Sequence, residues 1–355
     1  MKEEDRQLFE SILSPGEEKG RLKLAKVMRN GSLLLALPMN QALALATLGL
    51  YQPQRWKGRM MRMVMKTLVV LGLHRFLPTI EVKIGGAGLF SGLRGCASPE
   101  NFGFLLGNTE SKIRNLIGVY QDTDSLSVVK AGRGDSSAVI RSEYATMQQF
   151  SDRIDEAPQC RQCFEIENGA AYVVELVKGR SPRGSVDDKL VFGILMRWLD
   201  TGTETNVTEL DCWKSLEKKL DKKMMDSLGK LADTQVVSPV MHGDFAPWNI
   251  KIGSGNRVKV LDWEYTEVSG MPGWDWLHYH VQRMNLVSGK SAEIIVSSCR
   301  VLMGSDPMCT YLDQAGIHGL EDELLGSYLL YSGEILSYPR EELLKAWAHT
   351  REVTS

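Results

Sequence analysis

The feature that most constrains the fold of this chain is a series of short β-rich runs in its middle third. They are separated by turn-forming residues and cover residues 102–107, 112–121, 125–132 and 163–179. Asn168-Gly169 lies within the last run, and this dipeptide strongly favours a tight hairpin. One segment with helical character, 136–152, interrupts the series. Because hairpins join antiparallel neighbours, we predict an antiparallel sheet with one inserted helix.

The rest of the chain has a different pattern. Residues 187–202, 210–233 and most of the sequence after about 275 show the apolar spacing of helices. We therefore predict an α+β chain with three regions: a mostly helical N-terminal extension at 1–80, a sheet domain at 81–179 and a helical domain at 180–355. Within the extension, an apolar strand precedes a helix that begins near residues 38–41.

A basic amphipathic helix is expected within residues 54–78 of the extension. Cations alternate there with apolar residues: Arg55, Lys57, Arg59, Arg62 and Lys66 with Trp56, Met60, Met63, Val64 and Leu68. Such a helix often packs on a neighbouring domain. The alternative is that it contacts an anionic membrane surface or an acidic partner.

Composition excludes several classes of protein. The net charge of −2 gives no overall field that would attract nucleic acid. The N-terminus is polar and acidic, unlike a secretory signal, and no run of 18 apolar residues is present. Six cysteines spread over 355 residues are typical of reduced thiols, so we expect a cytoplasmic protein. Cys160 and Cys163 have no second pair at the spacing of a zinc site.

One stretch carries the residues expected of a reactive site. Asp244 and Asn249 lie five positions apart in "HGDFAPWNIKI", and Asp262 follows in "VKVLDWEY". Polar residues at 253–256 predict a tight hairpin between the two segments, which would bring Asn249 and Asp262 side by side. An amide oxygen and a carboxylate are hard ligands suited to Mg²⁺. Asp244 could then accept or orient the proton of an attacking hydroxyl.

The pattern H-G-D-x-x-x-x-N, followed by D-W-E at 262–264, resembles the aminoglycoside phosphotransferase and choline kinase group of the protein-kinase-like fold. In that group His-Gly-Asp stands where protein kinases have His-Arg-Asp. The stretch "GMPGWDWLHY" at 270–279 extends the resemblance, although Met271 replaces an aspartate of the usual pattern. Asp275 is then expected to brace the catalytic loop. The resemblance covers about residues 100–290.

This resemblance implies a bilobal α+β fold that binds ATP and Mg²⁺. It implies that Lys130 contacts the α- and β-phosphates and that Glu143 on the next helix pairs with this lysine. Asn249 and Asp262 would hold the metal ion. The main chain around Glu175 and Val177 would contact adenine, and a turn would cover the phosphates with Gly107, Asn108, Thr109 and Ser111.

The implied reaction is transfer of the γ-phosphoryl group of ATP to a hydroxyl of a small molecule, such as a sugar, an amino alcohol, an aminoglycoside or a lipid head group. Asp244 and Asn249 are the expected catalytic residues. Two alternatives remain at this stage. One is a catalytically silent nucleotide-binding scaffold, and the other is nucleotidyl transfer to a protein on the same fold.

Overall fold

A computed structural model describes residues 2–93, 101–106, 114–122, 125–150, 153–336 and 338–354 of the chain. The chain forms two compact units. The first comprises residues 1–152 and 157–177, and the second comprises residues 153–156 and 178–355. The chain passes from the first unit to the second after Val177, two residues before the predicted end of the sheet domain.

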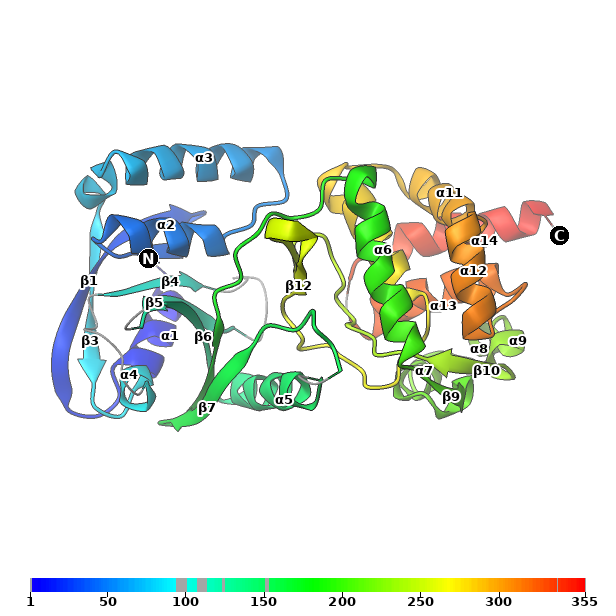
Figure 1. Cartoon of the computed structure of the whole chain (residues 1–355), viewed down its shortest axis with the longest axis horizontal. Helices are drawn as coiled ribbons and strands as arrows, with labels where there is room; N and C mark the ends of the chain where they lie inside the picture. The colour runs from blue at the N-terminus through cyan, green and yellow to red at the C-terminus, as the bar shows by residue number, and fades with distance from the viewer. Residues whose placement is uncertain are drawn as a thin grey trace. The chain divides into compact units, whose positions relative to one another are not determined.

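The first unit contains an eight-stranded antiparallel sheet (Figure 1). Its strands follow the order β3-β1-β2-β4-β5-β6-β8-β7. Their bounds are β1 Glu18–Arg29, β2 Ser32–Leu37, β3 Thr79–Gly85, β4 Phe102–Leu106, β5 Leu116–Gln121, β6 Leu126–Arg133, β7 Cys160–Ile166 and β8 Gly169–Glu175. The helices of this unit are α1 Glu3–Leu13, α2 Gln41–Leu50, α3 Trp56–Val70, α4 Leu89–Gly92 and α5 Asp135–Phe150.

The predicted meander and its inserted helix are confirmed. Strands β4, β5 and β6 pair in sequence order, and α5 lies between β6 and the β7–β8 hairpin. Asn168 adopts a left-handed φ of 57° at the hairpin tip, which is the conformation that this turn requires.

The prediction that residues 1–80 form a separate extension is wrong, although α2 and α3 form where the sequence predicted helices. Residues 18–29 and 32–37 form strands β1 and β2, and β3 begins at Thr79, so this region supplies three strands of the common sheet. The alternation in "GRLKLAKV" is the local reason. Leu22 and Leu24 are buried while Arg21 and Lys23 are exposed, and this period of two is that of a strand with one covered face.

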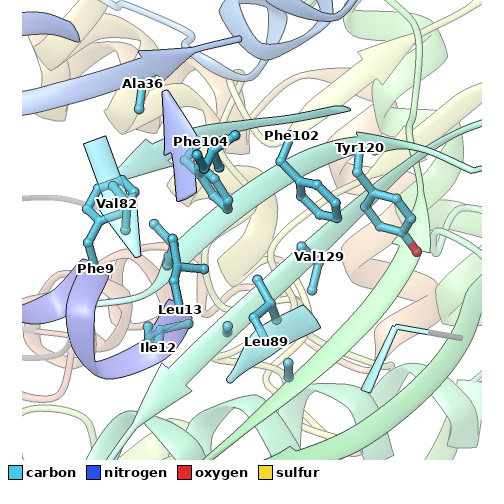
Figure 2. Close-up of a cluster of buried hydrophobic side chains, with 14 of the residues drawn as sticks. Phe9, Ile12, Leu13, Ala36, Val82, Leu89, Phe102, Phe104, Tyr120 and Val129 are labelled. Atoms are coloured by element: carbon cyan, nitrogen blue, oxygen red, sulfur yellow. The ribbon is translucent and has the colours of Figure 1, made fainter. Parts of the chain in front are cut away.

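Both faces of the sheet carry an apolar core. Figure 2 shows one cluster, in which Phe9 of α1 lies edge-on to Phe104 of β4 with ring centroids 5.6 Å apart. Tyr120 stacks on Phe102 at 4.9 Å in the same cluster. On the opposite face, α2 and α3 pack on residues of β1 and β2 such as Leu35. Alternate residues of one strand therefore enter different cores.

The second unit is mainly helical, as predicted. Its longer helices are α6 Ser185–Asp200, α7 Asp211–Glu217, α10 Trp274–Gln282, α11 Ala292–Met303, α12 Asp306–Ala315, α13 Glu321–Glu334 and α14 Glu341–Thr354. Short helices α8 Lys222–Asp226 and α9 Gly229–Ala232 lie between α7 and β10. Two small antiparallel pairs complete it, β9 Thr203–Asn206 with β10 Gln235–Ser238 and β11 Ile250–Ile252 with β12 Val258–Val260. Within the described part of the chain, no helix has the length and apolarity needed to cross a bilayer.

Candidate active site

The first unit contains a buried ion pair between its sheet and α5. Lys130 lies on β6, paired with Ile117 of β5 on one side and Tyr172 of β8 on the other. Its Nζ donates to Oε2 of Glu143 on α5 at 2.7 Å. Lys130 is 6% exposed and Glu143 1% exposed. Burying either charge alone would be costly, so each stabilises the other. The predicted pair is thus present, while its role toward phosphates stays a prediction.

The segment predicted to contact adenine lies at the end of the first unit. The main-chain N–H of Glu175 donates to the carbonyl of Gln159 at 3.1 Å, and the side chain of Glu175 accepts from the N–H of Gln159. Among the described residues, the main-chain N–H of Val177 has no hydrogen-bond partner and is half-buried. It is therefore a suitable donor to a ring nitrogen. The predicted phosphate turn, Gly107, Asn108, Thr109 and Ser111, lies outside the described residues.

In the second unit, Asp275 fixes the start of the loop that carries Asp244. The two carboxylate oxygens of Asp275, on the first turn of α10, accept the main-chain N–H groups of His242 and Gly243 at 2.7 and 3.0 Å. Gly243 has a left-handed φ of 79°, and a Cβ there would lie 2.3 Å from the main-chain oxygen of Tyr265. Only glycine fits this turn. Asp275 is thus the brace that the sequence predicted.

His242 links this loop to the segment that contains Asp262. Its Nε2–H donates to the carbonyl of Leu261 at 2.9 Å, and its Nδ1 accepts the main-chain N–H of Asp244 at 3.2 Å. Burial lowers the pKa of His242, so the neutral ring that these two bonds require is the stable form at neutral pH. The imidazole holds the two segments together and is too enclosed to meet a substrate.

Asp244 is surrounded by hydrogen-bond donors. Its Oδ1 accepts Nε2–H of His278 at 2.9 Å and the hydroxyl of Tyr338 at 2.8 Å. Its Oδ2 accepts Nδ2–H of Asn249 at 2.9 Å. Burial by itself would raise the pKa of Asp244, but the hydrogen bonds from His278 and Tyr338 bring the pKa below its ordinary value. Asp244 is therefore ionised at neutral pH.

The lone pairs of Asp244 determine where a further donor can bind. Each carboxylate oxygen accepts about two hydrogen bonds. Among the residues that the structure describes, Oδ1 has two donors, and Oδ2 has one from Asn249. A substrate hydroxyl would therefore be accepted by Oδ2. The geometry fits a carboxylate that orients a hydroxyl and takes its proton.

Asn249 and Asp262 come together through the predicted hairpin. Strands β11 and β12 pair with Ile250 opposite Val260, and the N–H of Leu261 donates to the carbonyl of Asn249 at 2.7 Å. Asp262 follows directly and has a φ of 67°, which is rare for a residue with a side chain. Strain of this kind concentrates at functional sites.

The donor set of this hairpin fits Mg²⁺. The amide Nδ2 of Asn249 donates to both the carbonyl and Oδ2 of Asp244. This leaves its amide oxygen as the atom that could bind a cation. Together with the carboxylate of Asp262, it offers the hard oxygen atoms that Mg²⁺ prefers. That Asn249 and Asp262 bind a metal ion stays a prediction.

Sequence reasoning did not find the contacts that His278 and Tyr338 make with Asp244. His278 lies on α10, the helix that begins at Trp274. Its position three residues after Asp275 on α10 is the available signal, since residues i and i+3 share a helix face. Tyr338 lies 94 residues after Asp244, and no local pattern indicates it. Cys160 and Cys163 lie on β7, outside the loop that carries Asp244. Burial raises the pKa of Cys160 to about 12, so its thiol stays protonated at neutral pH.

No family model matches the sequence, and no curated protein matches it. Among solved structures, the chain is similar to choline kinase LicA from Streptococcus pneumoniae, with 18% identity and a TM-score of 0.42 over 70% of this chain and 90% of that one. Aminoglycoside phosphotransferase APH(3'')-Id from Streptomyces rimosus gives 13% identity and a TM-score of 0.44, over 64% and 91% of the two chains.

A third similar structure is spectinomycin phosphotransferase APH(9)-Ia in complex with ADP and spectinomycin, with 9% identity and a TM-score of 0.39 over 72% and 89% of the two chains. These neighbours are from the group that the sequence motifs resemble. Identities of 18% or less and TM-scores below 0.5 do not transfer a substrate or a residue role to this chain.

Proposed function

We propose that this chain transfers the γ-phosphoryl group of ATP to a hydroxyl group of a small molecule, with Mg²⁺ as cofactor. The observation that carries the proposal is the environment of Asp244. An ionised, almost fully buried carboxylate is held by side-chain donors from three separate segments, namely His278, Tyr338 and Asn249. Such a fixed, charged carboxylate, close in the chain to the hairpin that carries Asn249 and Asp262, suits a base that orients a hydroxyl.

Asp244 orients the acceptor hydroxyl and receives its proton as the new oxygen–phosphorus bond forms. The bond between the γ-phosphorus and the bridging oxygen breaks, and ADP leaves with that electron pair. Asn249 serves two purposes: its Nδ2–H groups hold Asp244, and its amide oxygen is available to the metal ion. When bound by Asn249 and Asp262, Mg²⁺ supplies positive charge against the phosphate oxygens.

Lys130 supplies a second positive charge for the nucleotide. Its ion pair with Glu143 fixes the ammonium group in the sheet, so little conformational freedom is lost when a phosphate binds. The main-chain N–H of Val177 is a candidate donor to the adenine ring.

The test is an ATP-consumption screen with purified protein. The acceptor panel contains sugars, amino alcohols and aminoglycosides, and product mass distinguishes phosphoryl transfer from nucleotidyl transfer. Asp244→Asn keeps the shape of the side chain and removes the base, so we expect a loss of at least about 100-fold in kcat. Asp262→Asn should nearly abolish turnover because it removes the negative charge that would hold the metal ion.

Asp313→Asn is the matched control because this aspartate is exposed on α12 and its side chain pairs with His318; it should leave kcat unchanged. ATP binding without turnover across the whole panel would instead indicate the silent scaffold. Wild-type phosphotransfer by Asp262→Asn would refute the metal assignment.

A further inference from the structure

Helix α3 has apolar residues on two opposite faces. Met65 and Val69 on its inner face are buried in the core that it shares with α2 and the sheet, and Met61 and Leu68 pack against that core. The outer face is also apolar but is exposed. Its residues are Trp56, Met60, Met63, Val64, Val70 and Leu71, each at least 52% exposed. Packing within this unit explains only the inner face.

The exposed apolar residues form one stripe. At 3.6 residues per turn, these six positions fall within an arc of roughly 120°, centred opposite Met65 and Val69. The stripe continues beyond the helix through Leu73 and Phe76, and Phe76 is 85% exposed. Within the first unit, α2 lies between α3 and the sheet, so α3 is the outer layer on that face (Figure 1). Exposed apolar groups this numerous and contiguous mark an interaction surface.

The same region is strongly basic. Between Glu18 and Glu81 the chain has no aspartate or glutamate, although the whole sequence contains 44 of them. The interval holds eleven of the 42 lysine and arginine residues, namely Lys19, Arg21, Lys23, Lys26, Arg29, Arg55, Lys57, Arg59, Arg62, Lys66 and Arg75. On α3, exposed Lys57 flanks one side of the apolar stripe, and exposed Arg59 and Lys66 flank the other.

We propose that this α3 surface, the exposed residues of 55–76, binds the surface of an anionic phospholipid bilayer. A bilayer offers an apolar layer beneath a plane of negative charge, and the α3 surface presents an apolar stripe between two rows of cations. Trp56, with Nζ of Lys57 5.9 Å from its ring centroid, combines an apolar body with a polar edge, as residues at membrane interfaces do.

The charge of the α3 surface also argues against a second copy of this chain as its partner. A second copy of this chain docked through the same surface would bring its five exposed cations, Arg55, Lys57, Arg59, Lys66 and Arg75, against five others without an acidic residue in 55–76, which is repulsive. The stripe runs along the outward side of a helix, and a flat, fluid apolar layer matches such a convex shape. Binding of this kind does not depend on the proposed phosphotransfer.

The experiment is flotation of the full-length protein with lipid vesicles. One vesicle type is pure phosphatidylcholine, and the other contains about one third phosphatidylglycerol to supply negative charge. We expect the protein to float with the anionic vesicles only and to be released by high salt, because salt screens surface charge. Emission from Trp56, identified by comparison with Trp56→Phe, should shift to shorter wavelength on binding.

Two pairs of substitutions separate the apolar and electrostatic contributions. Arg59→Gln with Lys66→Gln should lower the partition coefficient about fivefold per removed cation. Met63→Ser with Phe76→Ser should lower it at least about tenfold, because two inserted apolar side chains are lost. Val301→Ser, at a valine 74% exposed on α11 of the second unit, is the matched control and should bind like the wild type.

All five side chains are exposed, so the variants should fold, and equal thermal melting would verify this. The proposal is overturned if the protein stays unbound to anionic vesicles at low salt, or if it binds neutral vesicles equally well. It is also overturned if the α3 variants and the Val301 control bind alike. Capture by an acidic peptide without vesicle binding would contradict a lipid partner.

Discussion

The buried pair of Lys130 and Glu143 allows a sharp test, because stability and nucleotide binding should respond differently to its removal. In Lys130→Met, the carboxylate of Glu143 would stay 1% exposed without its 2.7 Å partner. Breaking a buried pair in this way costs about 3–5 kcal/mol. That is a large share of the roughly 5–15 kcal/mol that stabilises a typical domain. Replacing both residues, as in Lys130→Met with Glu143→Leu, removes both charges of the pair and should recover most of the lost stability.

The assay is native-state hydrogen exchange of the amides of β6 and β8, which reports on the first unit alone, combined with urea unfolding followed by circular dichroism. Arg141→Met is the matched control, since Arg141 and Glu165 form an exposed pair in the same unit. Exposed pairs contribute about 0–1 kcal/mol.

ATP affinity should be reduced in both the single and the double Lys130 variants, because only the wild type offers the ammonium group. A cost below about 1 kcal/mol for Lys130→Met would refute the reasoning about burial. Failure of the double variant to regain stability would do the same. Normal ATP affinity in the stable double variant would contradict the assigned role of Lys130.

Three further outcomes concern the second unit. Tyr338→Phe removes one donor from Oδ1 of Asp244, so the pKa of Asp244 should rise. The acidic limb of the pH profile of kcat should then move to higher pH, and kcat should fall about tenfold. An unchanged pH profile would contradict this. The hydrogen bond from Arg180 lowers the pKa of Asp187 to about 2, below its unfolded value of about 3.9. Above pH 4, the pair should therefore contribute at most about 2 kcal/mol to the free energy of unfolding. This contribution should disappear as the pH falls from 4 to 2 and Asp187 is protonated. In Asp187→Asn, the urea concentration at the unfolding midpoint should change less between pH 4 and pH 2 than in the wild type. An equally steep decrease in both proteins would contradict this prediction. Gly243→Ala should lower the free energy of unfolding by at least about 2 kcal/mol and abolish activity. The φ of 79° is unfavourable for alanine, and its Cβ would lie 2.3 Å from the main-chain oxygen of Tyr265, so the loop would be displaced. A wild-type melting temperature would refute this.

The sequence alone determined those parts of the site that depend on short separations along the chain. Asp244 and Asn249 are held together by a loop of five residues, and the turn at 253–256 sets the hairpin that brings Asp262 beside Asn249. Lys130 could be placed on a strand because its neighbours follow the pattern of one. In each case the covalent chain and local turn preferences restrict the geometry to few possibilities.

Tertiary structure decided the rest. Whether Glu143 faces Lys130 depends on how α5 rotates against the sheet, and the three N-terminal strands join that sheet only through pairing of distant segments. Tyr338 reaches Asp244 across 94 residues because helices of the second unit pack together. Such contacts arise from burial and packing, which a local pattern does not encode. The apolar outer face of α3 has the same origin, because the sequence shows an amphipathic basic helix but only the packed structure shows which apolar residues remain exposed.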